Sequence, residues 1–147
     1  MGLLATALAC LAMSPGCGGP AVEASPSATP FALTYERSGG LKATPQKLTI
    51  GPGRHAIATI ADTRGGTKTV RFQIPRKRVQ NLRQGLAQAH FSQLESPPPG
   101  NCADCYLYSI SYRGHEVTVG QADMSDRLDD VVTELETLIH AHAVPPG

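Results

Sequence analysis

The chain has 147 residues, 41% of them apolar, and its 13 Lys and Arg nearly balance its 12 Asp and Glu. Residues 31–147 have the composition of one folded domain, and a chain of that length can bury about two thirds of its unfolded surface. We expect no nucleic-acid partner, because the basic residues are not interleaved with aromatic ones and no nucleic-acid-binding motif is present.

The balanced net charge hides an uneven distribution. Residues 31–92 carry eleven Lys and Arg against two acidic residues, and residues 93–147 carry two against nine, so the halves are about +9 and −7. The two halves can complement each other within one fold. Alternatively, the basic half forms a face for an anionic partner such as a wall polymer or lipid headgroups.

The N-terminus resembles an export signal. Residues 3–13 are apolar but too short for a bilayer, which needs about 20 residues, and they match the core of a signal peptide. The positively charged segment that usually precedes such a core is missing. Cys17 lies between small residues, as at the lipidation site of a bacterial lipoprotein, where the thiol forms the thioether. Cys10 fits this pattern locally but would leave too short an apolar segment for the signal peptide. The alternatives to lipidation are plain secretion and a cytosolic chain.

These features predict three segments: a signal peptide at 1–16, a lipidated tether at 17–30 and a single domain at 31–147. Residues 18–30 are mostly small residues and prolines, which cannot bury enough surface to order themselves. Such a tether would hold the domain off the membrane. The predicted location is the outer face of the cell membrane, with a fully secreted protein as the alternative.

Four strands are predicted before the first helix, because apolar and polar residues alternate. They cover residues 31–37, 46–50, 54–61 and 69–74 and are separated by the glycine-rich turns "SGG", "GPG" and "TRGGTK". Gly39 and Gly40 end the first strand with turn or bulge geometry.

Two helices and a hairpin follow. Pro75 opens the first helix, where its missing N–H costs nothing, and Gly85 weakens that helix by about 1 kcal/mol relative to Ala. Residues 106–120 form a hairpin that turns at Arg113–Gly114, and residues 125–140 form an amphipathic helix. The order β-β-β-β-α-β-β-α predicts an α+β domain, a single antiparallel sheet with both helices on one face.

Cys102 and Cys105 form a Cys-x-x-Cys after the proline-rich loop 96–101. A thioredoxin-like site would open a helix, whereas this motif precedes a strand, and a zinc site would need two more soft ligands. We expect a small disulfide, which stabilises by about 2 kcal/mol at most and fixes the shape of the loop. Redox activity and metal binding are the alternatives.

Three cations, Arg76, Lys77 and Arg78, lie at a predicted helix N-terminus, where the helix dipole disfavours them. Such a local inconsistency can mark a partner-binding site, and pairing with the acidic second helix or simple solvation is the alternative. The histidines lack metal-ligand spacing, and no nucleophile motif or phosphate-binding loop is present. We therefore predict no catalytic residues, metal, cofactor or small-molecule substrate.

Several short motifs resemble emfourin-like proteins, which are small bacterial inhibitors of thermolysin-type metalloproteases. The motifs are "YERSGG", then "AD" followed by "YLYSISYRGHEVTV", then Asp123 before the last helix. The residues that match the family pattern are Arg37, Gly39, Gly40, Ala103, Asp104, Tyr108, His115 and Val117. The extra strand between "GPG" and "RGG", the Cys-x-x-Cys and the tether depart from the family. The matching residues look structural, so they do not transfer an inhibitory site.

The resulting hypothesis is an exported, lipid-anchored binding domain without catalysis, with protease inhibition as its first specific function. An inhibitor can wedge a rigid loop into a protease cleft, and Gly39, Gly40 and Leu41 and the turn closed by the disulfide are loops of that kind. One alternative is an envelope module that binds a wall polymer or an envelope protein through its basic half. The other is a redox lipoprotein that uses Cys102 and Cys105.

Overall fold

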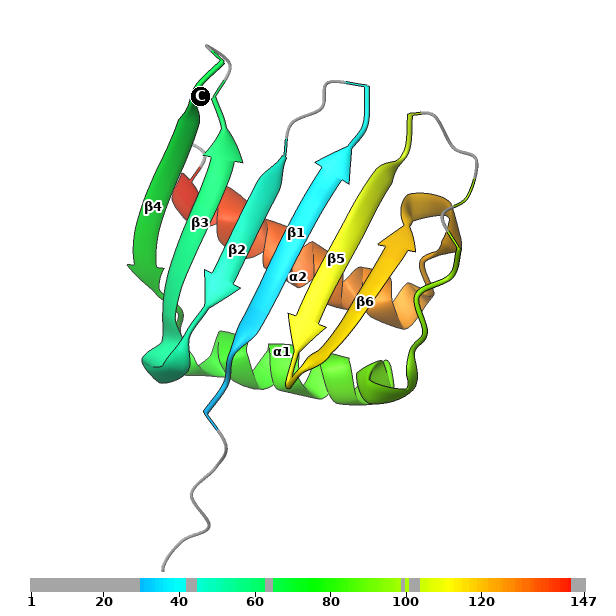
Figure 1. The fold of residues 1–147 in the computed structure, drawn as a ribbon. Helices are drawn as coiled ribbons and strands as arrows, with labels where there is room; N and C mark the ends of the chain where they lie inside the picture. The colour runs from blue at the N-terminus through cyan, green and yellow to red at the C-terminus, as the bar shows by residue number, and fades with distance from the viewer. Residues whose placement is uncertain (1–29, 42–44, 63–64, 99, 101–103, 144–147) are drawn as a thin grey trace, which may run out of the picture.

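A computed structural model of the protein describes residues 30–41, 45–62, 65–98, 100 and 104–143. It has one six-stranded, fully antiparallel open sheet of order β4-β3-β2-β1-β5-β6, with two helices on one face (Figure 1). The strands are β1 (Leu33–Gly39), β2 (Gln46–Ile50), β3 (His55–Ala61), β4 (Thr67–Gln73), β5 (Tyr106–Tyr112) and β6 (His115–Gly120). The helices are α1 (Arg76–Gln88) and α2 (Asp126–Ala143). The predicted α+β class and element order are confirmed.

Some predicted features lie outside the described residues. They are the signal peptide, Cys17 with almost all of the tether, and three residues before β5 that include Cys102 and Ala103. The lipidation of Cys17 therefore stays a prediction.

The strands form because alternate residues face the helices, as period-two patterning requires. In β1, Leu33 and Tyr35 are buried beneath the helices, while Thr34 and Glu36 lie on the open face. The open face is mostly polar. It carries a ladder of hydroxyl groups from neighbouring strands, including a 3.1 Å contact between Ser109 Oγ and Thr118 Oγ1.

The two helices cover the other face and pack against each other. The buried positions of α1 follow helical spacing: Val79, Leu82 and Leu86. The stripe of α2 is wider and holds seven buried residues: Leu128, Val131, Val132, Leu135, Leu138, Ile139 and Ala143. Asp126 and Asp129 lie in the first turn of α2, where the helix dipole favours negative charge.

The element boundaries differ from the predicted ones by a few residues. The first strand extends to Gly39 because its pairing with β5 continues to Tyr106, and the last helix continues to Ala143. Three short 3₁₀ helices were not predicted: Pro52–Arg54, Phe91–Gln93 and Gln121–Asp123. They are single turns at chain reversals, where apolar periodicity carries no signal.

The hydrophobic core is continuous, and all its members lie between Phe31 and Ala143. Strands β1 and β2 cross its middle, so Tyr35 and Leu48 are fully buried. A chain that begins at Pro30 therefore contains every core residue among those that the structure describes, which makes it the form to use in experiments.

Candidate functional site

The two surface segments predicted from the sequence lie at opposite ends of the sheet (Figure 1). Gly39–Leu41 follows the end of β1, whereas Arg76, Lys77 and Arg78 open α1 near the start of β1. The fold does not bring them into one site, so each is described separately.

The Gly39–Leu41 loop approaches the backbone of the chain that enters β5. Gly39 and Gly40 have φ values of +81° and +77°, which side-chain-bearing residues rarely adopt. A β-carbon on Gly39 would lie 2.6 Å from the carbonyl oxygen of Cys105, and one on Gly40 would overlap the ring of Tyr106. The N–H of Gly40 donates to the same Cys105 oxygen at 3.2 Å. Both glycines are therefore required by the local geometry.

Leu41 extends from this fixed base into solvent. Its side chain is 84% exposed, more than any other large apolar side chain among the described residues. Leu107, on the open face beside the loop, is 39% exposed and pairs with Ser38. The described part of the loop thus presents one highly exposed leucine at the end of the sheet.

The base of the loop is tied to α2 by a charged network. The side chain of Arg37 is only 12% exposed, and its Nη1 donates to Glu136 Oε1 at 2.7 Å. Its guanidinium also lies 4.5 Å from the ring centroid of Tyr106, in a cation–π contact. The hydroxyl of Tyr35 donates to the same Glu136 oxygen at 3.1 Å. Strand, helix and loop base are therefore held together by one carboxylate.

Two tyrosines around this network, Tyr35 and Tyr108, have raised pKa values. Burial, and then the carboxylate of Glu136, raises the pKa of Tyr35 well above its ordinary value. Burial and Glu136 also raise the pKa of Tyr108, in the same order of importance. A neutral, buried Tyr35 hydroxyl that donates to a carboxylate is a positional element, and this arrangement rigidifies the loop base.

Cys105 is disulfide-bonded, and its partner lies outside the described residues. The pairing of Cys102 with Cys105 thus stays a prediction. The carbonyl of Cys105 is the acceptor for Gly40, so a bond that fixes this segment would also fix the base of the Gly39–Leu41 loop.

The three cations at the start of α1 separate in the structure. Arg78 Nη1 lies 2.6 Å from Glu134 Oε2 on α2, and the hydrogen bond and the charge of Glu134 raise the pKa of Arg78. Arg76 and Lys77 are exposed. The ion pairs of Arg37 and Arg78 join the basic and acidic halves, so the complementarity expected from the sequence holds for these two arginines.

Sequence reasoning missed Glu136 as a partner of the loop base. Glu136 is 99 residues from Arg37, and it stands in α2 as one of several solvent-side acids. No local pattern distinguishes it from its neighbours. The only signal was the basic residue before the two glycines, which gave no indication of the partner.

In the part of the chain that the structure describes, no group of three or more His, Cys, Asp and Glu side chains is placed to hold a metal ion. Among the same residues, no helix combines the length and apolar character needed to cross a bilayer.

Comparison with protein-family models and with curated proteins finds no match to this chain.

Proposed function

We propose that this protein is an exported, lipid-anchored binding domain without catalytic activity, and that it inhibits a thermolysin-type metalloprotease through the Gly39–Leu41 loop. The observation that carries the proposal is that the side chain of Leu41 is 84% exposed. The base of its loop is held in place by the hydrogen bond from Gly40 to Cys105 and by the ion pair of Arg37 with Glu136. The resemblance of "YERSGG" and the hairpin to emfourin-like proteins supplies the protease class.

A rigid loop is suited to this task because binding then orders few additional groups. Each rotamer-rich side chain immobilised in a complex costs about 0.5–1.5 kcal/mol. Here Arg37 is already immobilised by Glu136 and Tyr106, and Gly40 by Cys105. The apolar side chain of Leu41 remains to be buried in the cleft, and its burial is the favourable term.

The test is a titration of residues 30–147 into a thermolysin-type protease, with hydrolysis of a peptide substrate as the readout. We expect stoichiometric loss of activity without cleavage of the domain. Leu41→Ala removes three carbon atoms from the side chain. Their burial in the protease cleft would contribute about 2 kcal/mol of binding free energy, so the inhibition constant should rise about 30-fold.

Ile57→Ala is the matched control, because it also removes three carbon atoms from an exposed site on the open face, but on β3 and away from the loop. It should leave the inhibition constant within about twofold, which corresponds to less than about 0.5 kcal/mol. Full inhibition by both variants would contradict the role of Leu41. Absence of inhibition by the unaltered domain would contradict the protease proposal itself.

The second candidate function is an envelope module that binds an anionic wall polymer. The exposed Arg76 and Lys77 favour it, because they lie near other cations at one end of the sheet. Salt separates the two functions: polymer binding should weaken steeply with ionic strength, whereas a leucine in a cleft should be little affected.

The third candidate, a redox lipoprotein, depends on the pair of Cys102 and Cys105. Cys105 is half-buried and lies just before β5 rather than at a helix N-terminus, so the structure offers no dipole to stabilise a thiolate there. A measurement of the reduction potential of this pair tests the candidate, because structural disulfides lie below about −300 mV.

A further inference from the structure

Four arginines surround the point at which the chain enters the domain. We call them the basic collar: Arg54, Arg76, Arg83 and Arg113. They come from the β2–β3 turn, from the first and middle turns of α1 and from the β5–β6 turn, all at the end of the sheet opposite the Gly39–Leu41 loop (Figure 1). These arginines line three hollows. Two of the hollows share Pro30, and the third shares Arg83 with one of them and Arg113 with the other.

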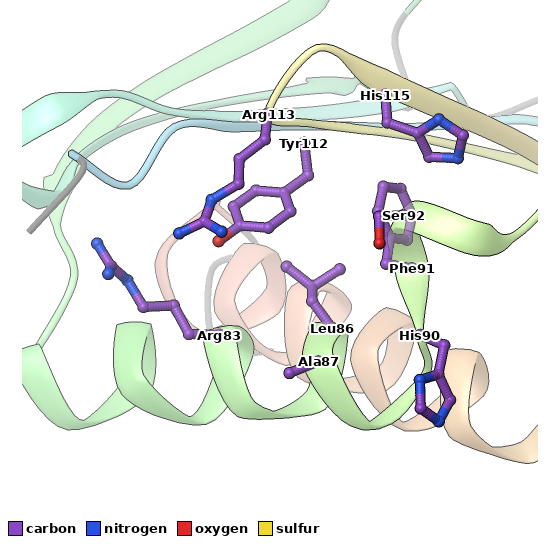
Figure 2. A pocket seen from close by; sticks show the side chains of 9 residues that line it. All are labelled: Arg83, Leu86, Ala87, His90, Phe91, Ser92, Tyr112, Arg113 and His115. Carbon is purple, nitrogen blue, oxygen red and sulfur yellow. The ribbon is translucent and has the colours of Figure 1, made fainter.

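The largest of these hollows has a volume of about 400 Å³ and takes two collar arginines from different elements, Arg83 and Arg113 (Figure 2). The Arg113 guanidinium lies 5.2 Å from the ring centroid of Tyr112, and that of Arg83 lies 5.4 Å from the ring of Phe31. The two rings are 5.4 Å apart, so the cations lie together over an aromatic base. Figure 2 shows both guanidinium groups on the same side of the hollow.

None of the described residues that line the three hollows is Asp or Glu. A concentration of guanidinium groups around hollows without carboxylates attracts anions, and guanidinium groups pair well with phosphate oxygens.

We propose that the basic collar binds the anionic phospholipid surface to which the protein is anchored. This inference rests on the lipid anchoring in the proposed function. Cys17 precedes Pro30 by thirteen residues, a length of chain that spans at most about 45 Å, so the collar is the part of the domain held closest to the membrane. The tether raises the local concentration of headgroups at the collar, which makes weak individual contacts sufficient.

This orientation also places the other end of the domain. The Gly39–Leu41 loop lies at the far end of β1, whose seven residues span about 24 Å. With the collar on the headgroups, Leu41 points away from the bilayer and is accessible to a protein outside the cell.

The experiment uses residues 30–147, which contain every described residue of the core and lack Cys17, so it reports on the collar whether or not Cys17 is lipidated. Sedimentation with vesicles of phosphatidylglycerol and phosphatidylcholine measures binding, and vesicles of phosphatidylcholine alone are the neutral control. We expect binding to the anionic vesicles only, lost at high salt. Each cation near an anionic surface changes affinity about fivefold, so Arg76→Gln with Arg113→Asn should weaken binding about 25-fold.

The substitutions spare the fold, since Arg76 and Arg113 are exposed and Asn tolerates the φ of +54° at position 113. Lys47→Gln with Lys68→Gln is the matched control, because it removes the same charge at the other end of the sheet. Arg76→Lys with Arg113→Lys should keep most of the binding.

The collar proposal would be overturned if the arginine pair, Arg76→Gln with Arg113→Asn, and the lysine control pair weakened vesicle binding equally. Binding to soluble polyphosphate without binding to anionic vesicles would also overturn it, in favour of a wall polymer. Protease inhibition is measured separately, so its failure would not be confused with either result.

Discussion

Replacing Gly85 by alanine should destabilise this protein, although alanine is the better helix former. Gly85 lies in α1 where the helix packs on α2, and a β-carbon there would be 2.9 Å from Cγ2 of Val131. Relief of the glycine penalty would stabilise the helix by about 1 kcal/mol. Overpacking costs about 1–3 kcal/mol, and the β-branched Val131, 2% exposed on its own helix, cannot rotate away. The free energy of unfolding should therefore fall by about 1 kcal/mol.

The sign of this effect should reverse when the obstacle is removed. Val131→Ala deletes Cγ2, so adding Gly85→Ala in that background should raise the free energy of unfolding by up to about 1 kcal/mol. Both effects are measured by urea unfolding, followed by far-ultraviolet circular dichroism, of four proteins: the unaltered protein, Gly85→Ala, Val131→Ala and the double variant. Asn81→Ala, at an exposed position of α1, is the control for helix propensity and should stabilise by a few tenths of a kcal/mol. Stabilisation by Gly85→Ala in both backgrounds would refute the reasoning.

Two further predictions concern the network and the disulfide. A tyrosine in the unfolded chain has a pKa of about 10, whereas burial and Glu136 raise the pKa of Tyr35 in the folded protein. The neutral hydroxyl of Tyr35 therefore contributes its full stability below about pH 10, and this contribution is lost as the pH rises further. The free energy of unfolding should fall above about pH 10 and fall less steeply in Tyr35→Phe, and equal slopes would show that Tyr35 does not control this loss. If the bond of Cys105 is structural, its reduction potential should lie below about −300 mV, and a value near that of disulfide oxidoreductases would favour the redox candidate instead.

The sequence by itself determined the elements of this protein and their faces. Tyr106, Tyr108, Ile110 and Tyr112 alternate along β5, and the stripe of α2 repeats at helical spacing, because which face a residue occupies is set by local geometry. The turns at Gly114 and at the end of β1 were likewise predictable, since glycine readily adopts the positive φ values found at Gly114, Gly39 and Gly40. These local rules gave the α+β class and the order of the elements.

Only the tertiary structure decided which residues meet. Strand β5 pairs with β1 across more than sixty residues of chain, and this pairing brings Tyr106 against Arg37 while α2 supplies Glu136. The sequence grouped Arg76 with Arg78, yet packing of α2 on α1 gives Arg78 a carboxylate partner and leaves Arg76 in the collar. Periodicity encodes the face on which a side chain lies, whereas its partner depends on how all the faces pack at once, and the loop base and the collar are products of that packing.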